Sequence, residues 1–259
     1  MNLLLGKNAL ILGANTITIG IATRYVAEGA SVTVVAQSDA LADYPAPEGA
    51  KSVSVSGNAV EADRQAISAV AGASLDILVL GGDDVPEERD WVAVSALSAD
   101  VLHNAQDRMV IPALQALQAC EAALKAASDA SIIFLYSPAG IYSEGGWSSH
   151  TVSYHALHGM MRAVASEWGP VRANMLVPFA DTPGFRAFRE RNPAEVDERI
   201  SLTAMKRVGD PVNDIGRVAV FMGSDDTHYV TGMMIFADGG AHMIAPAIET
   251  KMPLAGKSA

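Results

Sequence analysis

The sequence predicts an α/β fold in which helices cover both faces of one parallel sheet. Short runs of β-branched and aliphatic residues alternate with alanine-rich segments through most of the chain, which is the pattern of repeated β–α–β units. Hydrophobic residues make up 50% and charged residues 18% of the 259 residues, a balance that favours a folded core over disorder. Because no linker, repeat or composition break divides the chain, residues 1–259 are predicted to form a single domain.

Each strand is predicted from a short apolar run, and each helix from a longer segment between two such runs. The predicted strands cover residues 9–12, 31–35, 52–55, 76–80, 131–136, 172–176 and 233–237. The predicted helices cover residues 20–28, 61–70, 100–127, 153–168 and 214–222. Gly29 is expected to end the first helix, and Pro112 is expected to kink or divide the long third one.

Two further segments stand outside this alternation. Residues 185–199 are the most charged stretch of the chain. We expect either a solvated helical flap or a mobile lid over a substrate, because such excursions follow strand ends in open α/β sheets. Residues 241–259 form a long tail with several apolar side chains, which is expected to be either a contact arm to another subunit or a loose terminus.

Charge and composition exclude several classes of function. The formal net charge of -11 opposes binding to nucleic acid, because little in the chain would neutralise phosphates. No apolar run reaches the roughly 20 residues that span a bilayer, and the first residues lack the features of a signal peptide. The single cysteine, Cys120, excludes an intrachain disulfide and is expected to be a buried, inert thiol. These features predict a soluble cytoplasmic protein without a membrane partner.

Several motifs follow one another in a recognisable order. Ser137 ends one predicted strand, Tyr154 begins the next predicted helix, and an Asn-Met-Leu-Val-Pro segment at 174–178 precedes Asp-Thr-Pro. Residues 214–225 and 231–240 then supply a helix, a strand and a glycine turn. In order and spacing these motifs resemble the short-chain dehydrogenase/reductase family over nearly the whole chain. The resemblance implies a Rossmann-like, doubly wound sheet.

The resemblance also implies an oxidoreductase that uses NAD or NADP. In that family a tyrosine exchanges a proton with the substrate oxygen, and a serine hydrogen-bonds the same oxygen. A lysine four residues after the tyrosine binds the nicotinamide ribose and lowers the tyrosine pKa. Tyr154, Ser137 and His158 stand at these positions. Asn104 is the candidate for the family's relay asparagine, with an exposed helix asparagine as the alternative.

The turn after the first strand departs from the family pattern. The family places glycines four and six residues after the first one, so that a dinucleotide pyrophosphate can approach the backbone at a helix N-terminus. Here the turn runs from Gly13 to Gly20 through Asn15, Thr16 and Ile19. Its β-branched side chains would crowd a phosphate, although a re-routed turn is the alternative. Gly20 is expected to serve helix packing rather than phosphate contact.

Two further candidate cofactor contacts are also unusual. Gln37 lies at the end of the second strand, where the family would place an acidic residue for NAD or a basic one for NADP. Gly81 stands in place of part of a polar segment that supports the adenosine side of the site. The candidate cofactor contacts, which also include Gly13, Asn15, Thr16 and Ile19, therefore look degenerate. We expect NAD or NADP if any cofactor binds, and none is the alternative.

The chemical departure is His158, which replaces the lysine. Histidine is shorter than lysine and mostly neutral at neutral pH, so it would hold the ribose poorly and leave the tyrosine with a high pKa. His158 is interpreted as a relic or helix-surface residue, with a working substitute as the alternative. A metal site with His155 or His150 has no supporting carboxylate or thiol spacing. Ser137 precedes Tyr154 by 17 residues, longer than is usual in the family.

That long spacing predicts an extended loop over residues 141–152. Trp147 within it is interpreted as a loop-packing residue, with a substrate platform as the alternative.

Three functions follow from these features. The first is a catalytically silent subunit that supports an alcohol or 3-hydroxyacyl dehydrogenase in a homo- or heterotetramer with a homologous subunit. Heteromeric members of the family include a dehydrogenase of benzylsuccinate (toluene) β-oxidation. The second is an active NAD(P)-dependent oxidoreductase of a small molecule, with a variant cofactor turn. The third is a non-redox enzyme similar to halohydrin dehalogenases.

Overall fold

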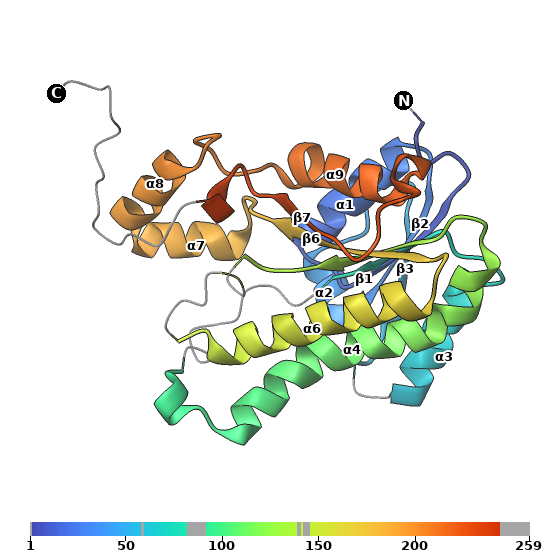
Figure 1. The fold of residues 1–259 in the computed structure, drawn as a ribbon, viewed down its shortest axis with the longest axis horizontal. Helices are drawn as coiled ribbons and strands as arrows, with labels where there is room; N and C mark the ends of the chain where they lie inside the picture. The colour runs from blue at the N-terminus through green and yellow to red at the C-terminus, as the bar shows by residue number, and fades with distance from the viewer. Residues whose placement is uncertain (1, 58–59, 82–91, 139–140, 142–145, 244–259) are drawn as a thin grey trace.

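One parallel sheet of seven strands forms the centre of the protein in the computed structural model, which describes residues 2–57, 60–81, 92–138, 141 and 146–243. The strand order is β3-β2-β1-β4-β5-β6-β7 (Figure 1). The strands are β1 (Asn8–Leu12), β2 (Ser31–Gln37), β3 (Lys51–Val55), β4 (Ile77–Leu80), β5 (Ser131–Leu135), β6 (Arg172–Pro178) and β7 (Met234–Ala237). This order is that of a doubly wound, Rossmann-like sheet. It confirms the predicted fold class.

Helices cover both faces of the sheet. α3 (Val60–Ala71), α4 (Ala99–Ala126) and α6 (Ser148–Glu167) lie on one face, and α1 (Thr16–Ala27) and α9 (Gly216–Gly223) lie on the other (Figure 1). The remaining helical elements of the described residues are α2 (Ser38–Asp43), α7 (Pro183–Arg191), α8 (Pro193–Leu202) and the short η2 (Val94–Ala96), η3 (Pro211–Ile215), η4 (Asp225–Thr227) and η5 (Ala241–Met243).

The side chains of β5 show how the two layers are held. Ile132 and Phe134 pack into the core shared with α4 and α6, whereas Ile133 and Leu135 pack into the core shared with α1 and α9. All five residues of the strand are buried. A strand buried on both faces carries apolar side chains on both, and the one polar residue of β5, Ser131, donates its hydroxyl to the Met222 carbonyl at 2.9 Å. This is why its apolar run in the sequence is continuous.

Two helices begin earlier than the sequence predicted. α1 begins at Thr16 rather than at residue 20, because Asn15 caps it inside the predicted turn. α6 begins at Ser148 rather than at residue 153, so Tyr154 lies in its second turn and does not begin it. The predicted loop over residues 141–152 is therefore partly helical.

Other predicted boundaries are also corrected. α4 runs through Pro112 without ending there, so the proline does not divide the helix. The charged stretch forms two helices, α7 and α8, rather than one. In the C-terminal tail the structure describes η5, and residues 244–259 lie outside the described part of the chain.

Candidate functional site

The carboxyl ends of β1 and β4 meet at the centre of the sheet, where a doubly wound fold usually binds its ligand. The Gly81 amide donates a hydrogen bond of 2.9 Å to the carbonyl oxygen of Leu12. A Cβ atom at Gly81 would lie 2.4 Å from that oxygen and 2.5 Å from Cγ2 of Thr18. Gly81 therefore lets the strand end pass close under α1, and the Thr18 side chain fills the space beside it.

Asn15 closes the N-terminus of α1. Its Oδ1 accepts hydrogen bonds from the backbone amides of Ile17 and Thr18, both at 3.0 Å. In return, the Thr18 hydroxyl accepts from the Asn15 amide at 2.8 Å, so the pair forms a reciprocal capping box. Asn15 is buried. Two first-turn amides that face outward at the end of a helix are thus already bonded within the chain.

Gly13 and Gly20, which bound the turn, have different roles. Gly13 has a φ of 89°, a left-handed conformation that favours glycine. A Cβ atom at Gly20 would lie 2.7 Å from the backbone of Pro211 in η3. Gly20 therefore allows α1 to pack closely on the segment before α9, as its sequence position suggested. Thr16 and Ile19 lie half-buried in the first turn of α1.

The edge formed by β2 and β3 is made mainly of neutral groups. Gln37 is exposed, and its side chain lies so close to Gly57 that a Cβ there would be 1.9 Å from Nε2. The hydroxyls of Ser38 and Ser54 are 2.5 Å apart. The Asp63 carboxylate accepts from the Gly57 amide at 2.8 Å. The Asp63 carboxylate is thus already hydrogen-bonded to the backbone.

Tyr154 lies on α6 above the end of β5. Its side chain is buried, and its ring centroid is 4.9 Å from that of Tyr136. Ser137 follows Tyr136 directly and is half-buried, so the end of β5 brings the serine into the neighbourhood of Tyr154. Asn104 is exposed on α4. The sequence does not identify Tyr136 as a site residue, because it belongs to no motif.

His158 lies one turn after Tyr154 and is half-buried. Burial lowers its pKa below the usual value, and the charge of Arg162 and the nearby His155 lower it further. The ring is therefore neutral at neutral pH. A lysine at this position would place a positive charge beside the phenol, and His158 does not supply one.

The loop before α6 is fixed by Trp147. Its backbone pairs with Val92 in an isolated parallel bridge, and its indole packs edge-on against the ring of His150 at 5.6 Å. These contacts agree with a loop-packing role. His150 is itself buried. In the described part of the chain, no group of three or more His, Cys, Asp or Glu side chains could hold a metal ion.

Comparison with known proteins identifies the family. The family model described as "Enoyl-(Acyl carrier protein) reductase" matches residues 12–242. A 12alpha-hydroxysteroid dehydrogenase from Clostridium sp. is 26% identical over 91% of this chain and 96% of its own length. A cis-2,3-dihydrobiphenyl-2,3-diol dehydrogenase from Pseudomonas sp. is 30% identical over 90% of each chain. The chain belongs to the short-chain dehydrogenase/reductase family.

A solved structure extends the likeness to three dimensions. The Beutenbergia cavernae protein, described as an NAD(P)-dependent gluconate 5-dehydrogenase, contains bound NADP. It is 25% identical, covers 93% of this chain and 98% of its own, and superposes with a TM-score of 0.78. This neighbour thus holds a nicotinamide dinucleotide, and the question for this chain is whether its own residues fit such a cofactor.

The residues at the turn do not fit the usual short-chain dehydrogenase/reductase contact. A pyrophosphate needs free backbone amides at the start of α1, but Asn15 holds those of Ile17 and Thr18. At the nicotinamide end, a ribose would meet the neutral ring of His158 in place of an ammonium group. Gly13 is retained at the turn. The free backbone amides at the start of α1 and the lysine ammonium group, which accompany that glycine in the family, are not.

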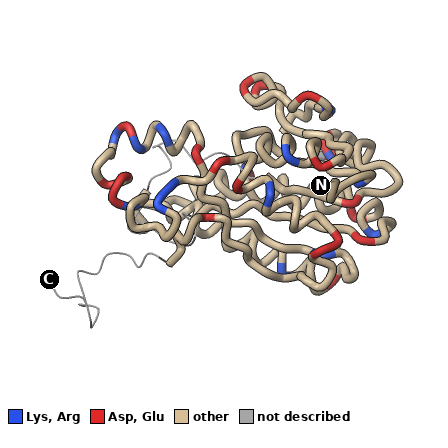
Figure 2. Tube along the Cα trace, turned by 90° about the horizontal axis from the view of Figure 1, so that it is seen from above, with Lys and Arg blue, Asp and Glu red and all other residues tan. Residues whose placement is uncertain are grey.

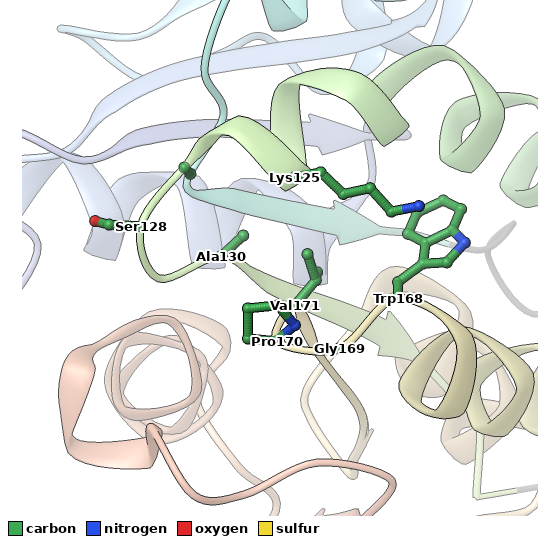
Figure 3. Close-up of a pocket in the computed structure, with 8 residues that line it drawn as sticks. Lys125, Ser128, Ala130, Trp168, Gly169, Pro170 and Val171 are labelled. Atoms are coloured by element: carbon green, nitrogen blue, oxygen red, sulfur yellow. The ribbon is translucent and has the colours of Figure 1, made fainter.

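Two regions lie away from this site. α7 and α8 form an arm on which acidic and basic residues are interspersed (Figure 2), and the ion pair between Arg189 and Asp197 joins the two helices at 2.6 Å. A cavity of about 250 Å³ lies near the amino ends of β5 and β6, where the ammonium group of Lys125 sits 5.3 Å from the centre of the Trp168 ring (Figure 3).

Two negative findings concern the whole described chain. No helix of the described residues is long and apolar enough to cross a membrane. Cys120 is completely buried, and burial raises the pKa of its thiol to about 12, so it is an inert core residue.

Proposed function

We propose that this chain is a short-chain dehydrogenase/reductase subunit that does not itself transfer hydride to or from a dinucleotide. It acts beside a homologous subunit in a mixed oligomer and supports an alcohol or 3-hydroxyacyl dehydrogenase there. The observation that carries the proposal is the Asn15 cap, which occupies amides that a pyrophosphate would need. The neutral His158 is a second, independent support.

Exposed apolar side chains support an oligomer. Tyr229, next to the last strand, is 96% exposed, and Met233 beside it is also largely exposed. Ile111 and Leu114 on α4 and Val152 on α6 expose part of a second surface. Large exposed apolar side chains are costly in water and often mark subunit contacts. These exposed side chains are the groups of this chain that a homologous subunit would cover in the proposed oligomer.

The retained residues favour one competing function. Ser137 still stands just after β5 and Tyr154 on α6, as an active NAD(P)-dependent oxidoreductase would require. An active enzyme should turn over NADH or NADPH as a purified single chain, whereas a silent subunit should not. The assay is absorbance of the reduced dinucleotide with ketone substrates, using the chain alone and His158→Lys as a matched variant.

Native mass spectrometry tests the assembly. The chain is co-expressed with each homologous family chain that is encoded beside it and retains Tyr-x-x-x-Lys. The proposal predicts a mixed particle and dinucleotide turnover that depends on the partner. Particles made only of this chain, together with turnover by this chain alone, would contradict it.

A further inference from the structure

The hydroxyl of Tyr136 is buried and has no hydrogen-bond partner in the described part of the chain. Its side chain is 1% exposed, and burial raises its pKa to about 12. Tyr25 is also fully buried, but its hydroxyl donates to the carbonyl oxygen of Ala219 at 2.9 Å. Buried polar groups without a partner are rare and costly. A bound group that accepts a hydrogen bond from the Tyr136 hydroxyl would remove this cost.

The position of this hydroxyl group is informative. Tyr136 directly follows β5 and points into the core beneath α4 and α6, the same side as Tyr154. Its ring lies 4.9 Å from that of Tyr154 and 6.2 Å from that of His155. Ser137 is its neighbour in the chain. The unpartnered donor thus belongs to the same strand end as the residues that match the family's substrate contacts.

We propose that Tyr136 is a ligand-binding residue whose hydroxyl donates a hydrogen bond to an oxygen atom of a neutral carbonyl or alcohol compound bound beside Tyr154. The inference rests on the proposed function in placing the ligand at Tyr154, and it adds that the chain binds this ligand without a dinucleotide. It also assigns a role to a tyrosine that no motif marks.

The charge of the neighbourhood decides the ligand class. A phenol with a raised pKa remains protonated at neutral pH and acts as a hydrogen-bond donor. His158, with its lowered pKa, contributes no positive charge. A carboxylate or phosphate at this point would therefore be desolvated without a counter-charge from His158, whereas a ketone or alcohol oxygen needs a donor alone.

A matched pair of probes tests the inference. β-Tetralone and tetralin have nearly the same shape, but β-tetralone alone carries a carbonyl oxygen. Binding of each to the full-length chain is measured by saturation-transfer NMR for wild type, Tyr136→Phe and the control Tyr25→Phe. Cyclohexanone and cyclohexane serve as a second, smaller pair.

We expect the wild-type chain to prefer the ketone over its hydrocarbon. Tyr136→Phe should weaken ketone binding by about three- to tenfold, the size of one hydrogen bond, and should leave hydrocarbon binding unchanged. Tyr25→Phe should bind both probes as the wild type does. Equal ketone affinity in wild type and Tyr136→Phe, or no ketone binding to wild type, would overturn the inference.

A direct measurement does not depend on the variant's affinity. In protein labelled at tyrosine Cζ, the signal that disappears in Tyr136→Phe is assigned to Tyr136, and it should shift when β-tetralone, but not tetralin, is added. An unmoved signal contradicts the inference. Dinucleotide binding to this chain would defeat the proposed silent role and leave these ketone results intact, so the two failures are distinguishable.

Discussion

Replacement of Asn15 tests the reading of the cofactor turn. Asn15→Ala removes the side-chain oxygen that accepts from the Ile17 and Thr18 amides at 3.0 Å each. It leaves the backbone and the β-branched side chains of the turn in place. Because the Asn15 side chain accepts two hydrogen bonds and is buried, the loss of unfolding free energy in this variant should lie in the upper part of the usual range for a lost N-cap.

The magnitude follows from measured caps. Replacing an N-cap by alanine costs about 0.5–2 kcal/mol. Because Asn15 Oδ1 accepts two hydrogen bonds, we expect Asn15→Ala to cost about 1–2 kcal/mol. For a domain of this size that corresponds to a drop in Tm of about 2–8 °C. Ser98→Ala is the matched control, because Ser98 is an exposed cap with one longer bond, 3.3 Å to the Val101 amide. It should cost about 0.5 kcal/mol.

Thermal unfolding followed by circular dichroism measures these changes, and Asn15→Gly separates capping from packing. Glycine is itself a tolerated N-cap and should cost only a few tenths of a kcal/mol, so the glycine variant should be more stable than the alanine variant. If Asn15→Ala melts at the same temperature as wild type, the cap does not hold the amides as described. The argument against a pyrophosphate at this turn would then fail.

Three other stability predictions use calorimetry. Tyr136→Phe should be neutral or stabilising, because it removes an unpartnered hydroxyl, whereas Tyr25→Phe should lose about 0.5–1.5 kcal/mol; equal losses would contradict the assignment of the unpaired group. Gly20→Ala should lose about 1–3 kcal/mol by overpacking, while Gly159→Ala, whose added Cβ meets nothing within 4 Å, should gain about 0.5–1 kcal/mol. A hydrogen bond from the neighbouring guanidinium lowers the pKa of Asp214 from 3.8 to about 2, so its contribution is present at neutral pH and lost as pH falls through that interval. Asp214→Asn should therefore lower Tm at about pH 7, by an amount that shrinks toward pH 2, and a pH-independent effect would contradict this.

The strands were predictable because their burial is continuous. β4 and β5 are buried at every position, and each run of aliphatic residues therefore marks a strand to within about two residues. The chain order of strands and helices then restricts the topology, because parallel crossovers are right-handed and follow simple rules. The sheet needed no information beyond the apolar pattern and the motif order.

The helix starts were less predictable, since they depend on local side-chain bonds. Asn15 and Thr18 have the spacing of a capping box, and the structure begins α1 at Thr16. The family's glycine pattern instead predicts a turn up to Gly20, four residues beyond the true start. The start of α6 at Ser148 was missed because Trp147, which ends the loop, is held by contacts distant in sequence. Such contacts have no local signal.

The candidate site was predictable in part. Motif order predicted Ser137 and Tyr154 as site residues, and the structure places Ser137 just after β5 and Tyr154 on α6; their catalytic role stays a prediction. The neutral charge of His158 at neutral pH followed from the ordinary pKa of histidine, and burial lowers that pKa further. Tyr136 could not be found in this way, because an unpartnered hydroxyl is a property of its three-dimensional surroundings.

The central claim is that this chain does not hold a dinucleotide, and a direct titration tests it. Purified chain is titrated with NADH and with NADPH, and energy transfer from tryptophan to the reduced nicotinamide is recorded beside isothermal calorimetry. The account predicts no saturable heat or fluorescence signal for either dinucleotide. Saturable binding of one molecule per chain, lost when the dinucleotide is displaced by its oxidised form, would contradict it.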